Sequence, residues 1–264
     1  GPPQVGKHTT AIALAQALNC SEDSPDIRCG NRSQCERISS GLHADVQIIT
    51  IESNVATIAI KEIRELLYNA NLMPYEGKRK VYIFPEANQL PLESANALLK
   101  MLEEPPDSVT FLLLTSQPEH LLPTIVSRCQ RIDFTPVSVD EIAIKLQEID
   151  NLSPTRAKEI ATYSNGIVGW AIQAATNPDI LSTYISRIEE ITDIIEGGTD
   201  TRLAFSERFG ASFSSNRDAS ISHLNNMVMW WRYILLIKES DEQIWHQIPA
   251  KPSIQRCASW ISTR

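Results

Sequence analysis

The stretch GPPQVGKHTT, residues 1–10, decides the fold because it is nearly a phosphate-binding loop. In such a loop, written G-x-x-x-x-G-K-[ST], glycines let backbone N–H groups surround phosphates, the lysine reaches the β- and γ-phosphates, and the hydroxyl holds Mg²⁺. Gly1, Gly6 and Lys7 fit this pattern, whereas His8 stands where the Ser or Thr belongs. The loop therefore keeps the groups that hold a phosphate and lacks its usual magnesium ligand.

The residues that follow the loop predict a helix. Residues 9–19 (TTAIALAQALN) are rich in Ala and Leu, as expected directly after a phosphate loop. Thr9 lies about 100° around that helix from position 8, so it does not replace the missing hydroxyl. A strand normally precedes such a loop and none precedes Gly1, so we expect a truncated N-terminus. The chain also stops without a clear helix cap, which favours a truncated C-terminus.

Strands and helices alternate after a polar, Cys-containing insert at about 20–42. The expected strands are 45–51, 80–84, 110–116 and 131–135, and the expected helices between them are 58–73 and 92–104. Pro105 and Pro106 enforce the end of the last of these helices. Such alternation predicts a parallel sheet with helices on both faces.

The character of the chain changes after FTPVS, and 264 residues suffice for about two domains on a prior of roughly 150 residues each. We expect an α/β core with a parallel sheet at 1–136, a small three-helix lid at 137–178 and an all-α domain at 179–264. The three lid helices are expected at 139–149, 154–163 and 168–176, and loops in the last domain near 197–200 and 249–253.

Composition excludes several classes of protein. The net charge of −8 gives no reason to expect autonomous binding to nucleic acid, and the one dense basic run, EGKRK at 76–80, is best interpreted as a solvated turn. The apolar run MVMWWRYILLI at 227–237 is shorter than the about 20 residues that span a bilayer, so it predicts a buried helix. No signal peptide is visible, and five Cys in 264 residues do not suit a secreted disulfide scaffold. We therefore expect a reducing, cytoplasmic location and no membrane partner.

Four segments together resemble the clamp-loader branch of the AAA+ ATPases. They are the loop at 1–9, KVYIFPEANQL at 80–90, SANALLKMLEEPP at 94–106 and LLPTIVSRCQRIDF at 121–134. The last two are highly specific in combination, because helical spacing alone would not fix N-A-L-L-K-x-L-E-E-P-P. The Cys-bearing insert points to the bacterial DNA polymerase III clamp loaders within this branch. The resemblance covers about 1–176 well, and the C-terminal helices match in character alone.

The resemblance implies which groups a hydrolysing member would need for its own ATP. The strand at 80–84 should be followed by Asp-Glu, but here Pro85 and Glu86 follow, so a second magnesium contact is gone. A polar sensor residue is expected at the end of the next central strand, which is Thr115 or Ser116. A second sensor, an arginine on the third lid helix, is replaced by Gly169.

The resemblance also implies a group that acts on the ATP of a neighbouring subunit. In the motif Ser127-Arg128-Cys129, Arg128 corresponds to the arginine finger, and Cys129 is expected to pack behind it. Glu103 and Glu104, at the end of an expected helix, have two interpretations that stay open. They are either solvated charges or part of a helix that lines an intersubunit contact.

The cysteines of the insert leave open whether the chain binds zinc. The family pattern, C-x8-C-x2-C-x2-C, binds zinc through four thiolates; Cys20, Cys29 and Cys35 are present, but the third position is Arg32, which does not bind a cation. Three alternatives remain: the zinc is lost, His43 supplies the fourth ligand, or water completes a weak site. Cys257 is expected to be an ordinary core residue.

These losses and the retained arginine imply a stator, a non-hydrolysing subunit that completes the active site of its neighbour. It needs no cofactor for catalysis, it is not an enzyme on its own, and occupation of its loop by ATP stays open. Its implied partners are the gamma/tau ATPase subunits and delta in a hetero-pentamer that loads the sliding clamp on primed DNA in replication. The alternative is an ATP-hydrolysing subunit of the gamma/tau type. The 94–106 and 127–129 motifs argue against an unrelated P-loop enzyme, and the net charge disfavours a DNA-binding module that acts alone.

Overall fold

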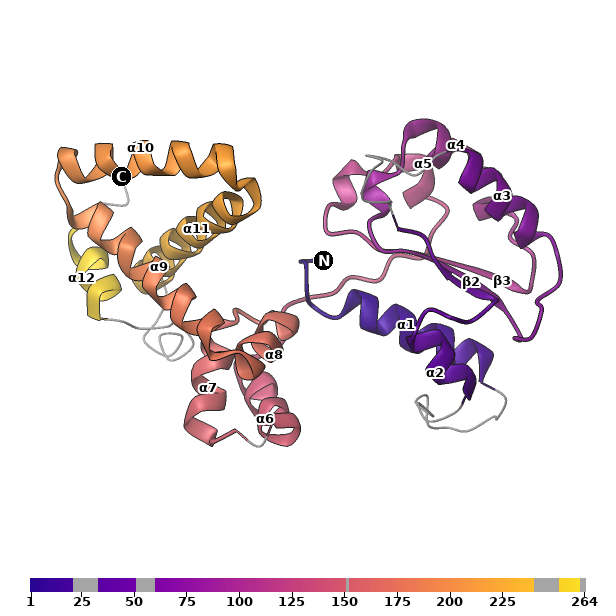
Figure 1. Ribbon diagram of the computed structural model, residues 1–264, viewed down its shortest axis with the longest axis horizontal. Helices are drawn as coiled ribbons and strands as arrows, with labels where there is room; N and C mark the ends of the chain where they lie inside the picture. The colour runs from indigo at the N-terminus through magenta and orange to yellow at the C-terminus, as the bar shows by residue number, and fades with distance from the viewer. Residues whose placement is uncertain (21–32, 51–59, 151, 240–251, 262–264) are drawn as a thin grey trace. The chain divides into compact units, whose positions relative to one another are not determined.

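The computed structural model describes residues 1–20, 33–50, 60–150, 152–239 and 252–261 (Figure 1). Contacts divide the chain into two compact units, Gly1–Thr135 and Pro136–Arg264. Each unit has cores of its own and is described by itself. No helix in the part of the chain described is long and apolar enough to cross a membrane.

The first unit is built on a parallel sheet of three strands, which confirms the predicted sheet type. The strands β1 (Val46–Ile48), β2 (Lys80–Phe84) and β3 (Val109–Leu113) lie in the order β1-β2-β3. The register places Val46 beside Val81, and Lys80 beside Val109. The central strand β2 is almost wholly buried, as its apolar sequence KVYIF predicts for a parallel strand covered on both faces.

Helices cover both faces of this sheet. The helical elements are α1 (Lys7–Asn19), α2 (Ser33–Ser39), α3 (Ile60–Ala70), η1 (Ala87–Gln89), α4 (Leu92–Glu103), η2 (Pro118–His120) and α5 (Pro123–Val126). Successive side chains of a strand point to opposite faces. Val81 and Ile83 accordingly pack in the core that includes α1 and α2, whereas Tyr82 and Phe84 pack in the core that includes α3 and α4. Figure 1 shows α1 and α2 on one side of the sheet and α3 and α4 on the other.

The turn before β2 is pinned by one carboxylate. Asp45 is almost fully buried and accepts backbone N–H groups from Tyr75, Glu76 and Gly77 at 2.8, 2.8 and 2.7 Å. Burial on its own would raise the pKa of Asp45, but these three N–H groups and nearby His43 outweigh it and lower the pKa. The basic run EGKRK therefore begins in a tight, anchored turn, as its sequence predicts.

The strand predicted at 131–135 is wrong. These residues form no strand in the structure, and Arg131 pairs with Asp133 across an exposed segment at 2.9 Å. An extended segment becomes a strand when a neighbour supplies a ladder of hydrogen bonds. Phe134 instead lies against the backbone of Gly1, where an added Cβ would sit 2.4 Å from the Phe134 carbonyl oxygen. The strands β1 and β3 are shorter than predicted, whereas β2 matches the strand predicted at 80–84. Residues 51–59 lie outside the described residues.

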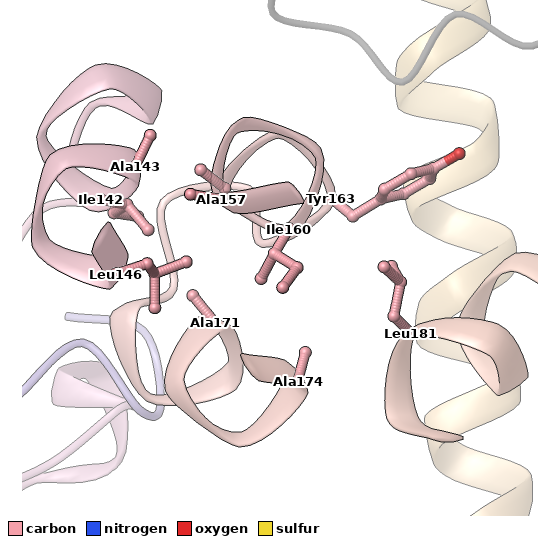
Figure 2. Close-up of a cluster of buried hydrophobic side chains, with 10 residues drawn as sticks. Ile142, Ala143, Leu146, Ala157, Ile160, Tyr163, Ala171, Ala174 and Leu181 are labelled. Carbon is pink, nitrogen blue, oxygen red and sulfur yellow. The ribbon is translucent and has the colours of Figure 1, made fainter. Parts of the chain in front are cut away.

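The second unit is helical in its described residues. Its helices are α6 (Val139–Asp150), α7 (Pro154–Tyr163), α8 (Val168–Thr176), α9 (Pro178–Glu196), α10 (Thr199–Ser215), α11 (Arg217–Glu239) and α12 (Pro252–Trp260). The first three confirm the helices predicted at 139–149, 154–163 and 168–176. They pack around a shared apolar cluster that includes Leu146, Ile160 and Ala171 and reaches Leu181 of α9 (Figure 2).

A second cluster joins α9, α11 and α12. Trp230 and Tyr233 of α11 and Cys257 of α12 are buried in it, which confirms the core position predicted for Cys257. The break between α10 and α11 was not predicted from the sequence. There Asn216 accepts the N–H of Ala219 at 3.1 Å, the usual role of an asparagine before a helix. The loop predicted near 249–253 lies mostly outside the described residues.

Candidate functional site

The phosphate loop has the backbone of an anion-binding turn. Gln4 and Gly6 have positive φ angles of 57° and 96°, and α1 begins at Lys7 directly afterwards. The first N–H groups of a helix have no partner within the helix, so they are available to an anion. His8 and Thr9 are both exposed in the first turn of α1.

Lys7 is held by its own loop. Its ammonium donates to the carbonyl oxygens of Gly1 and Pro2, both at 2.6 Å. Burial lowers the pKa of Lys7, and the negative charge of Glu86 opposes that shift. The carboxylate that follows β2 therefore acts electrostatically on the lysine of the loop.

The polar residues at the ends of β2 and β3 bond to the short helix η1. The Glu86 carboxylate accepts the side-chain amide of Gln89 at 2.6 Å. The Thr115 hydroxyl donates to Asn88 Oδ1 and accepts the N–H of Gln117, both at 2.9 Å. The hydroxyl of Thr115, one of the two residues predicted as a sensor, is thus engaged within the chain.

Of the remaining predicted positions, only Ser116 carries a polar side chain. Ser116 is exposed beyond the end of β3, Pro85 carries no carboxylate, and Gly169, in the first turn of α8, carries no side chain. A magnesium ion bound at this loop would therefore find neither a hydroxyl at position 8 nor a carboxylate at position 85. The loop and Lys7 fit a phosphate better than they fit a magnesium nucleotide.

Arg128 follows the single-turn helix α5 and is held on two sides. Its backbone N–H donates to Ile125 at 3.0 Å, and the buried Ile125 side chain anchors the turn. The guanidinium donates through Nη1 to the Thr124 carbonyl at 3.0 Å and to Ser127 Oγ at 3.4 Å. Through Nη2 it forms an ion pair with Glu103, the last residue of α4.

Cys129 is partly buried next to this arginine, and burial raises the pKa of its thiol. A raised pKa keeps the thiol protonated and unreactive near neutral pH. This environment supports a packing role for Cys129, as the sequence interpretation favours.

The structure describes two of the three cysteines of the insert. Cys20 ends α1 with an intermediate exposure and Cys35 is buried in α2, whereas Cys29 and Arg32 lie outside the described residues. Within the described ranges no group of three His, Cys, Asp or Glu side chains could hold a metal ion. The buried His43 accepts the Asp45 N–H through Nδ1 at 3.1 Å, and its Nε2 has no hydrogen-bond partner among the described atoms. A zinc site that includes Cys29 stays a prediction.

Comparison with known proteins places these features in a family. Residues 1–138 match the family model described as DNA polymerase III, delta subunit. The delta-prime subunit of DNA polymerase III from Bacillus subtilis (strain 168) is 27% identical over 242 residues, which cover 92% of this chain and 72% of that protein. The chain belongs to the delta-prime clamp-loader family of DNA polymerase III.

Other proteins similar to this delta-prime family member bear the names of further DNA polymerase III subunits. The tau subunit from the same Bacillus strain is 35% identical over 195 residues, which cover 72% of this chain and 34% of that protein. The chain thus spans about a third of tau and about three quarters of the delta-prime relative. A solved DNA polymerase III gamma subunit-related protein from Thermotoga maritima is 21% identical and covers 97% of this chain and 89% of that chain, with a TM-score of 0.38.

The sequence interpretation of this delta-prime family member missed three polar partners. Asn88 accepts a hydrogen bond from Thr115, and Gln89 donates one to Glu86. Glu103 forms an ion pair with the arginine of the Ser-Arg-Cys motif. For Glu103 the two interpretations left open were a solvated charge and an intersubunit contact, and neither included this ion pair. The two glutamates before Pro105 were visible in the sequence as candidate partners of an arginine. Which arginine they meet, 25 positions further along the chain, is decided by the tertiary fold.

Proposed function

We propose that this chain is a non-hydrolysing clamp-loader subunit, a stator, that supplies Arg128 as an arginine finger to the ATP of a neighbouring gamma/tau subunit. An arginine finger supplied in trans stabilises the charge of the transition state and contributes about 10³–10⁵ in rate. The complex that it serves would contain gamma/tau and delta subunits in a hetero-pentamer and would load the sliding clamp on primed DNA.

One contrast carries this proposal. Groups that would act on the subunit's own ATP are absent at His8, Pro85 and Gly169. Arg128, which would act on another subunit's ATP, is intact. A stator requires the loss of groups that act on its own ATP and the retention of the group that acts on its neighbour's ATP.

An exposed apolar stripe on α11 supports assembly with other subunits. Ile221, Leu224, Val228, Trp231 and Leu235 follow one another at intervals of three and four residues, so they lie along one face of the helix. Their exposed fractions run from 41% to 65%. A heptad-like apolar face of this kind is typical of helices that pack against a partner. We propose that α9–α12 form part of the collar that joins the ring.

Two substitutions in a reconstituted loader test the proposal. Arg128→Ala should lower the clamp- and DNA-stimulated ATPase at the neighbouring site by about 10³ or more, because it removes charge from the transition state. Lys7→Ala should leave the rate nearly unchanged. Equal damage from both substitutions would contradict the stator and favour the alternative, an ATP-hydrolysing subunit of the gamma/tau type.

A further inference from the structure

We propose that Glu103 is a positioning residue for Arg128, so that the finger is preorganised before a neighbouring subunit presents its ATP. This inference rests on the proposed function of Arg128. It adds a role for Glu103 at the end of α4, and the stator function proposed above does not by itself require that role.

The geometry around Arg128 fixes the guanidinium from two directions. Glu103 approaches from the end of α4 as the ion-pair partner of Nη2, and the Thr124 carbonyl approaches Nη1 from α5. The helices α4 and α5 also contact each other directly. An arginine side chain free in solvent would sample many rotamers, and this two-sided contact restricts them.

The held guanidinium keeps donors for a phosphate. Arginine has five N–H donors, and the bonds to Glu103, Thr124 and Ser127 use three of them in the described structure. The Arg128 side chain remains 30% exposed and that of Glu103 remains 52% exposed. The arginine is therefore oriented without being saturated, and the remaining N–H groups can face an incoming anion.

Placement at the end of α4 connects the finger to the rigid part of the unit. The helix buries Ser94, Ala95 and Leu98, and Leu98 packs in the core that includes β2. Its last residue, Glu103, thus belongs to a helix that packs in the core, whereas Arg128 follows the single-turn helix α5. The more firmly placed partner is thus the one that would orient the other.

The test uses a complete loader in which the ATPase subunit next to this chain is the one that keeps a functional catalytic site. Glu103→Gln and Glu103→Ala should lower kcat of that site by about three- to fivefold, the scale expected for a solvent-accessible ion pair. KM for ATP should stay constant, because Glu103 acts on the transition state through Arg128. Glu93→Gln, the same change at the exposed start of α4, should behave as the wild type.

A double-substitution cycle separates positioning from a general structural effect. In an Arg128→Ala background, Glu103→Ala should have no further effect on kcat, because the group that it orients is gone. An additional loss in that background, an unchanged kcat for the single variants, or a raised kcat would each overturn the positioning role.

The same series distinguishes the two proposals. If Arg128→Ala leaves kcat at the wild-type value, the stator function itself fails. If Arg128→Ala lowers kcat strongly while Glu103→Ala matches the wild type, the finger stands and the positioning role of Glu103 falls. Unfolding curves for each variant show whether the chain is folded in these assays.

Discussion

At the scale of single residues, one buried carboxylate organises the turn before the central strand. Asp45 accepts N–H groups from three successive residues of the 75–77 turn. Nearby, Asn19 accepts the N–H of Arg79 at 2.9 Å through its side-chain oxygen. An added Cβ on Gly77 would lie 2.4 Å from that same oxygen, which explains a glycine at this position.

Asp45→Asn should lower the free energy of unfolding at pH 7 by about 2 kcal/mol, because hydrogen bonds to a charged acceptor are lost and an amide N–H₂ faces backbone donors. The folded pKa of Asp45 is lowered, so its stabilisation is complete above the unfolded value of about 3.9 and is lost as pH falls through the folded value. Urea unfolding at several pH values checks this.

The stability gap between the wild type and Asp45→Asn should therefore narrow as the pH is lowered below 5, over the range in which both proteins fold. The exposed Asp107→Asn serves as the matched control and should show no comparable gap at neutral pH. A gap that is independent of pH would mean that the carboxylate charge is not what holds the turn.

The polar partners of the site show where inference from sequence stops. The loop at 1–7 and the Ser-Arg-Cys motif are recognisable because each is a contiguous pattern. The partners Asn88 for Thr115 and Glu103 for Arg128 are not, since each pair joins segments more than 20 positions apart. Only the packing of elements decides which neighbours such side chains find.

At the scale of elements, the start of the second unit depends on a glycine in a left-handed conformation. Gly166 has a φ angle of 80°, and its carbonyl accepts the N–H of Val137 at 3.0 Å. A Cβ at this position would lie 2.4 Å from the Cβ of Pro136 and 2.8 Å from the Val137 carbonyl oxygen. The loop between α7 and α8 and the segment before α6 are therefore in close backbone contact.

Gly166→Ala should lower the free energy of unfolding by about 2 kcal/mol or more, because the left-handed conformation alone costs roughly 1–2 kcal/mol for a residue with a Cβ and the clash adds to it. Urea denaturation followed by circular dichroism measures the change. Gly198→Ala is the control: its φ angle is −75°, and an added Cβ would meet no atom within 4 Å. Similar losses from both substitutions would contradict the close contact at Gly166.

The helices and strands were more predictable than the loops and the sheet edge. The expected helix at 92–104 and strand at 80–84 match α4 and β2 almost residue for residue, because apolar periodicity and the following prolines mark them. The failed strand at 131–135 has an equally suitable local pattern. It fails because a strand also needs a partner, and local pattern carries no information on partners.

At the scale of the whole molecule, the proposed stator function rests on a contrast between two sets of residues. The set that would use its own nucleotide lacks a hydroxyl at His8 and a carboxylate at Pro85. The set that would serve a neighbour keeps Arg128, which pairs with Glu103. Family membership supports a role in the DNA polymerase III clamp loader, and this contrast supports the stator.

The most direct test of the stator function measures nucleotide binding and turnover by the purified protein alone. A fluorescent ATP analogue would be titrated with and without Mg²⁺, and phosphate release would be assayed in the same samples. We predict no turnover and binding that is absent or independent of Mg²⁺, because neither His8 nor Pro85 supplies the usual oxygen ligand for the metal's coordination sphere. Magnesium-dependent binding with steady phosphate release would contradict this prediction, and the chain would then be an ATP-hydrolysing subunit in its own right.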